Sequence, residues 1–350
     1  MPIRKINIDE SFALSTNTLL IDVRSPSEYS HAHIPGAYNL PLLSDEERKI
    51  VGTLYKQQSR ELAIKKGLDF FGVKMRRMVE EIETLIKHKH DSNINTLVIH
   101  CWRGGMRSAT VAWLFDLYGF KVYTIDGGYK KYRQWVIERF NQNYPIEIIG
   151  GYTGSAKTEI IQSLKLVGEQ TIDLEGLANH KGSAFGAIGM PVQPSQEMFE
   201  NLLATELSKC KEINTTIWVE DESQRIGLVN IPQPLWNQLR TKQVYFFNIP
   251  FEERLNYLVL NYGVLPKDKL NAAILRIQKR LGGLETKNSI QFLENDEIHN
   301  CFNILLKYYD KLYIKGLQNR PQSNLKEITI LASNCISKIN AEKLLQIKAN

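Results

Sequence analysis

The fold of the first half of the chain is decided by one stretch, His100-Cys101-Trp102-Arg103-Gly104-Gly105-Met106-Arg107-Ser108. A short apolar segment, Leu97–His100, leads into it, and a helical pattern, Ser108–Tyr118, follows it. The two glycines let the backbone turn tightly between these elements. A strand, a tight loop and a helix in this order are typical of a parallel α/β sheet.

Outward from this stretch, the alternation of strands and helices continues on both sides. Thr18–Val23 and Phe120–Ile125 are predicted as strands, and Tyr129–Asn141 is predicted as a helix. Pro145 closes this helical region, because proline cannot continue a helix and restricts the residue before it. We therefore place a domain boundary near residue 142, with one domain over residues 1–142 and a second over residues 143–350.

The second domain repeats the alternation and then becomes mainly helical. Ile146–Ile149 is predicted as a strand and Lys157–Leu166 as a helix. Further strands are expected at Gln170–Leu174, Thr216–Glu220, Gln243–Ile249 and Lys326–Leu331, and helices from Phe251 to about Lys315 and at Ser337–Ile347. The expected fold class is α/β: a parallel-sheet domain, then a second α/β domain with a mainly helical C-terminal part.

The composition is that of an ordinary globular protein. Of the 350 residues, 43% are hydrophobic and 23% are charged, which excludes a mainly disordered, collagen-like or coiled-coil chain. The apolar runs are too short for a bilayer, which needs about 20 residues, and we recognise no secretory signal. We expect a cytoplasmic protein without membrane contact. The cysteines lack the short spacing of a metal site, so we expect no structural metal.

Positive charge gathers in one segment of the first domain. The net charge is +6, and Arg48–Arg77 alone holds nine basic and two acidic residues. Such a local excess is typical of a surface that binds a polyanion such as RNA. The candidate nucleic-acid-binding residues are Arg48, Lys49, Lys56, Arg60, Lys65, Lys66, Arg76 and Arg77.

Cys101 is the candidate nucleophile of the first domain. A glycine-rich loop that opens a helix points several N–H groups inward and creates an anion-binding site. Cys101 would lie at its centre, with Arg107 and Arg103 beside it, and both effects favour the thiolate over the thiol. We predict that Cys101, Arg103 and Arg107 form a catalytic site. Cys210, Cys301 and Cys335 have no such surroundings and are interpreted as structural.

A second glycine-rich loop opens the second domain, Gly150-Gly151-Tyr152-Thr153-Gly154-Ser155-Ala156-Lys157-Thr158. It fits the phosphate-binding pattern G-x-x-x-x-G-K-[ST] except that Ala156 replaces the glycine before the lysine. The predicted phosphate-binding residues are Gly151, Gly154, Ser155, Lys157 and Thr158, with Thr158 as a candidate Mg²⁺ ligand. Alanine is tolerable at this position if its φ is negative and costly otherwise.

Two acidic or polar segments accompany this loop. Thr216–Glu220 ends in carboxylates, so Glu220 and Asp221 are candidates to hold Mg²⁺. A glycine-rich segment that begins at a strand end offers a candidate substrate loop, because functional groups concentrate in such loops. Its candidate residues are Asp173, Glu175, His180 and Ser183, with His180 either a base or an ordinary hydrogen-bonding residue.

Three motifs of the first domain, Asp22–Tyr29, His33–Ala37 and Cys101–Ser108, resemble those of rhodanese-like domains in their usual order. Such domains carry sulfur or selenium on the loop cysteine, and the resemblance gives Asp22 and Arg24 a scaffold role beside the loop. The C-x5-R spacing from Cys101 is one residue longer than in most sulfurtransferases and resembles rhodanese-fold phosphatases. Loop length therefore leaves sulfur-group transfer and phosphate chemistry both open.

The pairing of a rhodanese-like domain with a P-loop domain is uncommon. Together with Asp126–Tyr129, Asp173–Gly186 and Glu220–Ser223, it resembles the bacterial tRNA 2-selenouridine synthases. The resemblance implies a cytoplasmic transferase that acts on tRNA with wobble 2-thiouridine. Geranyl diphosphate would place a geranyl group on the sulfur, and selenophosphate, made by another enzyme, would supply the selenium that replaces it. Cys101 would serve either as a perselenide carrier or as a nucleophile at the base.

Three other functions remain open at this point. A rhodanese-type sulfurtransferase with an accessory P-loop domain would turn over thiosulfate. A C-x5-R phosphatase would cleave a generic aryl phosphate. A non-catalytic module that only binds tRNA or a nucleotide would keep its function after Cys101→Ala.

Overall fold

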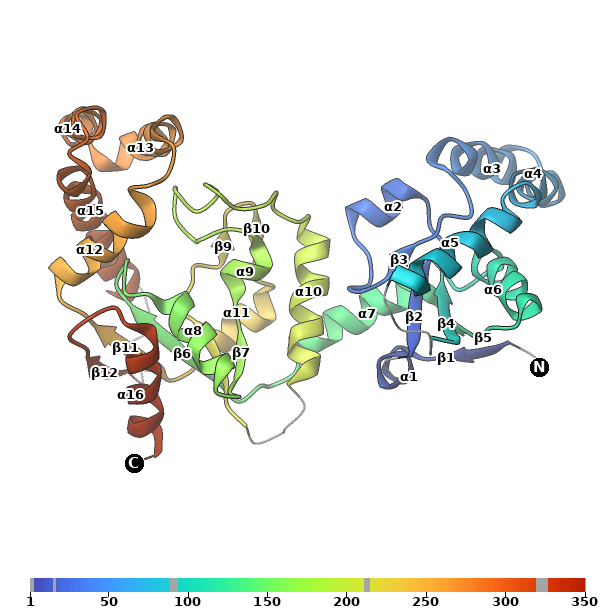
Figure 1. The fold of residues 1–350 in the computed structure, drawn as a ribbon, viewed down its shortest axis with the longest axis horizontal. Helices are drawn as coiled ribbons and strands as arrows, with labels where there is room; N and C mark the ends of the chain where they lie inside the picture. Colours follow the sequence, from blue (N-terminus) through green and yellow to red (C-terminus); the bar gives the residue numbers. More distant parts are fainter. Residues whose placement is uncertain (1–2, 15–16, 89–93, 211–214, 319–326, 350) are drawn as a thin grey trace. The chain divides into compact units, whose positions relative to one another are not determined.

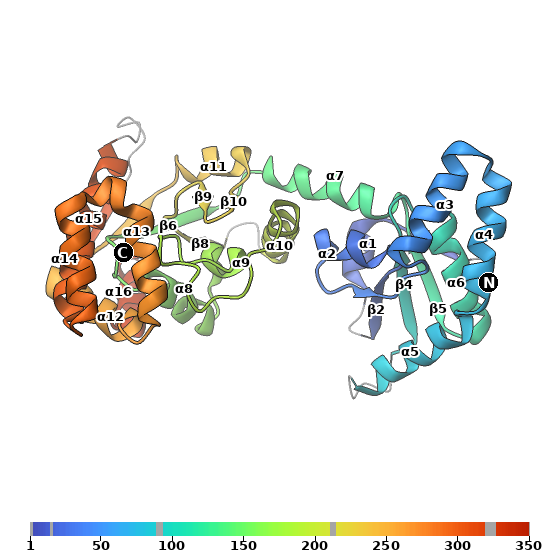
Figure 2. The ribbon, with the colours of Figure 1, turned by 90° about the horizontal axis from the view of Figure 1, so that it is seen from above.

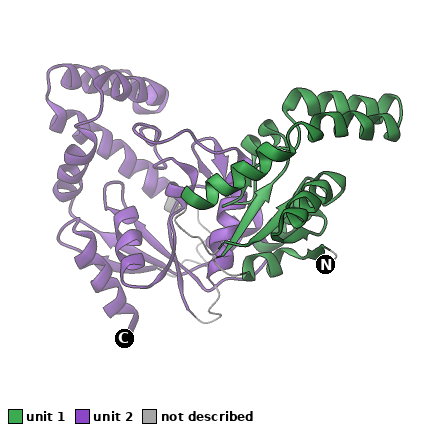
Figure 3. Cartoon of the chain, turned by 45° about the vertical axis from the view of Figure 1, so that its right-hand side comes forward, with its two compact units in different colours: residues 1–139 green, residues 140–350 purple. Residues whose placement is uncertain are grey.

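The computed structural model describes residues 3–14, 17–88, 94–210, 215–318 and 327–349. It divides the chain into two compact units, Met1–Arg139 and Phe140–Asn350 (Figure 3). Each unit contains a parallel sheet of five strands with helices around it. The expected fold class, two successive α/β domains with a helical C-terminal part, is confirmed.

The first unit is built on one sheet in which neighbouring strands run parallel (Figure 1). Its strands are, in spatial order, β1 (Arg4–Ile6), β5 (Lys121–Ile125), β4 (Thr96–His100), β2 (Thr18–Asp22) and β3 (Tyr38–Asn39). Its helices are α1 (Ile8–Ala13), α2 (Pro26–His31), α3 (Asp45–Gln57), α4 (Arg60–Gly72), α5 (Met75–His88), α6 (Met106–Tyr118) and α7 (Gly128–Phe140). The expected strands and helices here lie within about two residues of these bounds.

The core of the first unit explains why its central strands are continuously apolar. Ile21 of β2 and Leu97 and Ile99 of β4 are fully buried, and α6 buries Val111 and Phe115 against them. A parallel sheet is covered on both faces by its crossover helices, so its strands need apolar residues at successive positions.

Helices α3 and α4 form a helical hairpin between β3 and β4 in the sequence, and Figures 1 and 2 both show them side by side. A serine caps each of these helices. Ser44 accepts a hydrogen bond from the Glu47 backbone N–H at 3.2 Å, and Ser59 accepts one from Leu62 at 3.2 Å. These caps satisfy N–H groups that have no partner inside the helix.

The second unit is also built on a parallel sheet. Its strands are, in spatial order, β12 (Glu327–Leu331), β11 (Val244–Asn248), β6 (Ile146–Gly151), β8 (Ile217–Glu220) and β7 (Gln170–Ile172). A short antiparallel pair, β9 (Arg225–Ile226) and β10 (Val229–Asn230), lies apart from it. Strand β7 ends two residues earlier than expected, because Asp173 accepts a hydrogen bond from the Gly176 N–H at 2.7 Å and caps the next helix.

Helices flank this second sheet and then form a group of their own. They are α8 (Lys157–Leu166), α9 (Leu174–Ala178), α10 (Gln196–Lys209), α11 (Gln233–Leu239), α12 (Phe251–Tyr262), α13 (Lys267–Leu281), α14 (Gly283–Glu294), α15 (Ile298–Gln318) and α16 (Ser337–Ala349). Helices α12 to α15 share a core of their own that includes Leu255, Ile274 and Leu306. The expected helical region is therefore confirmed, while Lys326 lies outside the described residues. Within the described ranges, no helix has both the length and the apolar character needed to cross a membrane.

Candidate functional site

The Cys101 loop connects β4 to α6 and is held in place by the start of α7. Gly104 has φ +62°, and a Cβ atom there would lie 2.6 Å from the Ile125 carbonyl oxygen. The Tyr129 backbone N–H donates to the Cys101 carbonyl at 2.9 Å, and that of Lys130 donates to the Trp102 carbonyl at 2.9 Å. Glycine is therefore required at residue 104 for both conformation and space.

The surroundings of Cys101 favour its ionised form. The side chain is buried, and its Sγ lies 3.3 Å from the Ser108 hydroxyl. Burial by itself raises the pKa of this thiol, but hydrogen bonds from Ser108 and the Arg103 backbone, with the charge of Arg107, outweigh it and lower the pKa. A lowered pKa increases the thiolate fraction, which is the nucleophilic form.

The other cysteines show the opposite shift. Burial raises the pKa of Cys210 to about 11, of Cys301 to about 12 and of Cys335 to about 11. Thiols with such values remain protonated at neutral pH. Among the four cysteines, the chemical conditions for a nucleophile therefore occur at Cys101.

The two predicted arginines of this loop differ in their exposure to solvent and in their ion pairs. Arg103 is exposed, whereas Arg107 is partly buried and donates to the Glu28 carboxylate at 2.8 Å. Arg48 of α3 lies 3.5 Å from the same carboxylate. Glu28 was not predicted as a site residue, although it lies in the quoted Asp22–Tyr29 motif. It anchors Arg107 on α2 and thereby fixes a positive charge close to Cys101.

A buried ion pair lies beside this loop. The Arg24 guanidinium donates to both Asp22 carboxylate oxygens, to Oδ1 at 3.0 Å through Nε and to Oδ2 at 2.6 Å through Nη2, and to the Ala32 carbonyl at 2.7 Å. Its plane lies over the Tyr129 ring, 3.8 Å from the ring centre. Removing one partner of such a buried pair costs about 3–5 kcal/mol. Because the charges of Asp22 and Arg24 neutralise each other, the pair acts as a scaffold and neither charge is available for a reaction.

The glycine-rich loop of the second unit connects β6 to α8. Gly151 has φ +151° and Gly154 has φ +81°. The Lys157 ammonium donates to the Gly151 carbonyl at 3.1 Å, so the lysine folds back over the loop. This curled backbone at a helix N-terminus is the arrangement that binds phosphate in proteins.

Ala156 adopts the conformation that the sequence analysis identified as costly. Its φ is +55° and its ψ is +38°, in the left-handed region, and its side chain is buried. A non-glycine residue pays about 1–2 kcal/mol in this region because its Cβ approaches the carbonyl oxygen. Residue 156 therefore has the backbone conformation that glycine would adopt, and the alanine side chain makes this conformation strained.

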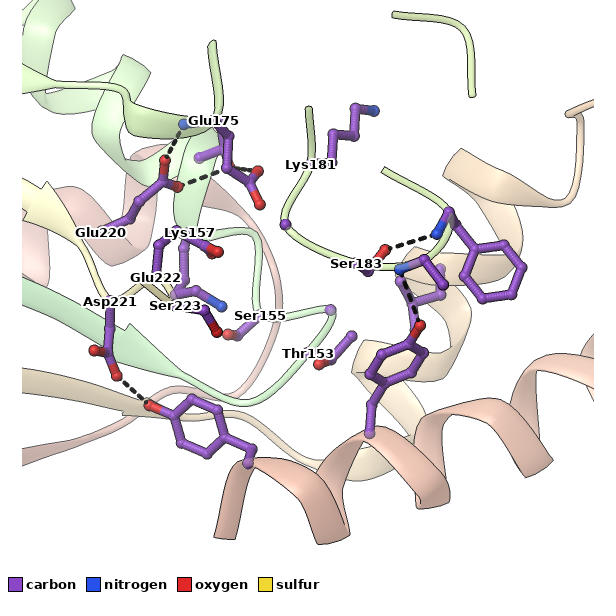
Figure 4. A pocket seen from close by; sticks show the side chains of 18 of the residues that line it. Thr153, Ser155, Lys157, Glu175, Lys181, Ser183, Glu220, Asp221, Glu222 and Ser223 are labelled. Carbon is purple, nitrogen blue, oxygen red and sulfur yellow. Dashed lines mark hydrogen bonds between the residues drawn. The ribbon is translucent and has the colours of Figure 1, made fainter. Parts of the chain in front are cut away.

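Three glutamates meet beside the loop. The Thr158 hydroxyl lies 3.0 Å from a Glu175 oxygen and 3.1 Å from a Glu220 oxygen, and the Glu175 backbone N–H donates to Glu220 at 3.0 Å (Figure 4). Burial and the neighbouring Glu222 raise the pKa of Glu175 to about 8, and burial and Glu220 raise the pKa of Glu222 to about 8. The pKa of Glu220 is raised as well, first by burial and then by Glu175.

Asp221, the predicted partner of Glu220, lines the same cavity but contacts other groups. It accepts a hydrogen bond from the Tyr313 hydroxyl at 2.9 Å (Figure 4), and it lies 3.6 Å from Arg240. Strand β8 ends at Glu220, and the Glu222 backbone N–H donates to the Glu220 carbonyl at 3.0 Å, so the chain turns at Asp221. Glu222 was missed as a site residue, although it lies in the quoted Glu220–Ser223 motif.

The predicted substrate loop is only partly assembled around the phosphate loop. Asp173, Glu175 and Ser183 line the same cavity as Lys157. His180 is buried outside the lining of that cavity, and its Nδ1 has no hydrogen-bond partner among the described residues. Burial, together with Arg276, lowers its pKa, so it is neutral at neutral pH.

The cavity above the phosphate loop has about 940 Å³ of space and two kinds of wall. Its polar floor consists of the phosphate loop, the three glutamates and Lys181 (Figure 4). Its apolar wall comes from the loop that contains Phe185 and from helices α12, α13 and α15. The wall includes Phe185, Leu258, Ile277, Phe302, Leu305 and Leu306. A ligand that fills it would combine an anionic group with an apolar body.

Arg254 fastens the phosphate loop to this helical group. It lies in α12, is 4% exposed, and donates to the Thr153 carbonyl at 3.0 Å and to both carboxylate oxygens of Asp310 in α15 at 2.8 Å. Sequence reasoning missed this residue, because an arginine in an amphipathic helix gives no local sign of burial. The ion pair fixes the loop with respect to the apolar wall of the cavity.

The predicted tRNA-binding residues lie on α3, α4 and α5. Seven of the eight are exposed and Lys66 is partly buried. Some charges are shared with acids, since Lys66 lies 3.4 Å from Asp69 and Arg76 lies 2.7 Å from Glu80. Exposed pairs of this kind interact weakly and leave the cations available to another anion.

Comparisons with known proteins agree with this architecture. Residues 10–134 match the model of the rhodanese-like domain, and residues 144–329 match that of the tRNA 2-selenouridine synthase AAA domain. A tRNA 2-selenouridine synthase of Nitrosomonas europaea is 34% identical over 90% of this chain and 93% of its own length. Relatives of the same name from Proteus mirabilis and Bdellovibrio bacteriovorus are 34% and 33% identical, over 86% and 87% of this chain and 89% and 90% of their own lengths.

The chain belongs to the tRNA 2-selenouridine synthase family. It is therefore an enzyme of the transferase class that modifies tRNA. Within the family, the rhodanese-like unit carries Cys101 and the AAA unit carries the phosphate loop and the cavity.

Ala156→Gly provides a test of the strained loop. Glycine removes the left-handed penalty but gains unfolded-state entropy, so we expect the free energy of unfolding of the second unit to rise by up to about 1 kcal/mol. Ala272→Gly is the matched control, because Ala272 is exposed within the right-handed helix α13 and should lose about 0.5–1 kcal/mol. Urea unfolding followed by circular dichroism measures both. A loss of stability in Ala156→Gly would contradict the left-handed assignment.

Stability should also depend on pH through the glutamate cluster. Glu175 and Glu222 hold protons up to a pKa of about 8 in the folded chain, whereas an unfolded glutamate loses its proton near pH 4.3. The folded state then binds more protons in between, so the free energy of unfolding falls as the pH rises from about 4.5 to about 8.

Glu222→Gln should make this pH dependence shallower, by about 1–3 kcal/mol between pH 5 and pH 8, because a neutral amide replaces one titrating group. Urea unfolding at several pH values measures the slope. Glu285→Gln is the control, since Glu285 is exposed on α14 and should leave the slope unchanged. Equal slopes in Glu222→Gln and the parent chain would refute the raised pKa.

Proposed function

We propose that this enzyme replaces the sulfur of wobble 2-thiouridine in tRNA by selenium, through an S-geranyl intermediate. The single observation that supports the geranyl step is the cavity of the second unit, where a phosphate-binding floor adjoins an apolar wall. Geranyl diphosphate has these two parts, a diphosphate and a ten-carbon chain.

The first step forms a bond between the thiouridine sulfur and C1 of the geranyl group while the C1–O bond to diphosphate breaks. Lys157 and the loop N–H groups stabilise the charge that develops on the leaving diphosphate. The uridine N3 proton is released to solvent in this step. S-alkylation prepares the second step, since an alkylated sulfur leaves as a thiol.

Mg²⁺ fits the oxygen donors near Thr158. In the described part of the chain, no group of three His, Cys, Asp or Glu side chains is arranged to hold a metal by itself. The Thr158 hydroxyl and the Glu220 carboxylate offer hard oxygen ligands. A magnesium ion held by these residues would need further oxygens from the diphosphate, and it would supply additional neutralisation of that group.

The second step belongs to Cys101 of the first unit. Its thiolate would add to C2 of the base and expel geranylthiol, and the selenium of selenophosphate would then displace the cysteine. Hydrolysis of the Se–P bond releases phosphate and leaves 2-selenouridine. This route balances without an oxidant, whereas a perselenide on Cys101 would require phosphorus to leave as phosphite. Arg103 and Arg107 are proposed to bind the selenophosphate, which another enzyme supplies.

Two variants should separate the steps. Cys101→Ala should keep geranylation and lose selenium incorporation, whereas Lys157→Ala should lose geranylation and still selenate tRNA that already carries the geranyl group. Nucleoside mass analysis of a 2-thiouridine tRNA measures both products, first with geranyl diphosphate alone and then with selenophosphate added. Cys210→Ala is the control and should behave as the parent chain.

Other outcomes would support the alternatives. Unchanged nucleosides with thiosulfate turnover would indicate a sulfurtransferase, and cleavage of an aryl phosphate would indicate a phosphatase. Unchanged selenation in Cys101→Ala would refute the role of Cys101. Loss of both steps in a folded Cys101→Ala chain would show that they share one site.

The basic residues of α3 to α5 are proposed to bind the tRNA backbone. Replacing Lys49, Lys56, Arg60 and Lys65 by glutamine should reduce the slope of log affinity against log salt by up to about 3–4, because each phosphate contact contributes about 0.7–0.9. Filter binding of tRNA across a salt series measures this slope. A double variant of the exposed Lys269 and Lys287 in the second unit is the control. An unchanged slope would remove this surface from the tRNA site.

A further inference from the structure

The rim of the Cys101 loop carries two large apolar side chains that are open to solvent. Trp102 is 37% exposed and Met106 is 50% exposed, while Cys101, next to Trp102 in the sequence, is 3% exposed. Trp102 directly follows the nucleophile in sequence, so any base that reaches the Cys101 thiol must come close to this indole. Tryptophan offers the largest flat surface of any side chain for a ring to stack on.

The Trp102 indole packs against a column of buried side chains that consists of Tyr129, Arg24 and Asp22. Its ring centre lies 5.6 Å from that of Tyr129, with the planes tilted by 41°. Tyr129 is fully buried, and its ring also has Tyr132, His100 and the Arg24 guanidinium as neighbours, the last 3.8 Å from the ring centre. Asp22 fixes that guanidinium through two oxygens. A backbone hydrogen bond from Lys130 to the Trp102 carbonyl, at 2.9 Å, fixes the main chain as well.

Such a column fixes an exposed aromatic ring before a ligand arrives. An exposed tryptophan on a mobile loop would lose rotational freedom on binding, whereas a ring that already rests on Tyr129 loses little. The buried ion pair therefore has a consequence at the surface: it supports the tyrosine, and the tyrosine supports the indole.

We propose that Trp102 is the platform on which the target base of the tRNA stacks when its C2 atom is presented to Cys101. The proposal rests on the function proposed above, in which the base reacts at Cys101. Proteins recognise single-stranded RNA by stacking unpaired bases on aromatic side chains. Trp102 is thus a binding residue for the base and takes no part in bond making.

The alternative occupant of this rim is the geranyl chain, and two substitutions distinguish it from a base. Trp102→Phe keeps a flat aromatic ring, while Trp102→Leu keeps only an apolar surface. Stacking of a base requires the ring, so phenylalanine should preserve function and leucine should not. A geranyl chain needs apolar surface alone, so both variants would then bind it similarly.

The first experiment measures selenation of S-geranylated tRNA in the full chain. For Trp102→Leu, stacking predicts a loss of kcat/KM of roughly tenfold to a hundredfold, carried by a higher KM for tRNA. Trp102→Phe should stay close to the parent chain. Trp113→Leu is the matched control, because Trp113 lies on α6 in the same unit, is 50% exposed and follows Trp102 by eleven residues, outside the Cys101–Ser108 loop. Thermal unfolding confirms that each variant folds.

The second experiment needs no turnover. A tRNA anticodon stem-loop with 2-thiouridine should quench the fluorescence of the parent chain, since stacking on a base quenches an indole. Trp102→Phe should lose this quenching although the other four tryptophans of the chain remain, and Trp113→Leu should retain it. Unchanged quenching in Trp102→Phe, or an unchanged KM in Trp102→Leu, would overturn the proposal.

Failure of the proposed function has a different signature. If the parent chain produces no 2-selenouridine, the proposed function fails, and the quenching experiment still decides whether Trp102 stacks on the base. Equal activities of Trp102→Phe and Trp102→Leu, both below the parent chain, would assign the rim to the geranyl chain and overturn base stacking.

Discussion

Both sites depend on backbone that turns left-handed directly after a parallel strand. Parallel strands end at one edge of a sheet, and a loop that leaves this edge can point its N–H groups at a ligand only if some of its residues have positive φ. Gly104 provides this after β4, and Gly154 provides it after β6. Ala156 has the same handedness without the freedom of glycine. The alanine therefore shows that the loop geometry is maintained by its surroundings and not only by its own sequence.

Those surroundings are buried charges that are paired with one another. Arg254 joins Thr153 of the phosphate loop to Asp310 of α15, and Arg24 joins Asp22 to the Ala32 carbonyl beside the cysteine loop. A buried guanidinium has several donors in a fixed plane, so it can connect three groups at once. In each unit one such arginine fixes a reactive loop without taking part in its chemistry.

The pKa values of the key ionisable groups are shifted in opposite directions in the two units, as the proposed function of each unit requires. In the first unit, hydrogen bonds and the charge of Arg107 lower the pKa of Cys101 and favour a nucleophile. In the second unit, burial and mutual repulsion raise the pKa of Glu175 and Glu222 to about 8. Carboxyl groups that stay neutral near pH 7 do not repel an anionic ligand from the neighbouring phosphate loop. This chain thus combines a site suited to a thiolate with a site that we propose binds a diphosphate.

The sequence by itself determined the two parallel sheets, the position of both glycine-rich loops, the place of Cys101 in the first of them and the resemblance to the family. These features are local, because a strand, a glycine-rich turn and a helix are each encoded by neighbouring residues. Their sequence patterns can therefore be recognised without knowledge of the rest of the fold. The tertiary structure alone decided that Glu222 and not Asp221 joins Glu175 and that Ala156 has positive φ. It also decided that helices α12, α13 and α15 line the apolar wall and that Trp102 packs against Tyr129, which itself packs against Arg24. Most of these features depend on side chains that are far apart in the sequence and meet only when whole helices and strands pack together, which no local pattern predicts. At Ala156 the feature is a φ angle, which the identity of one residue does not fix.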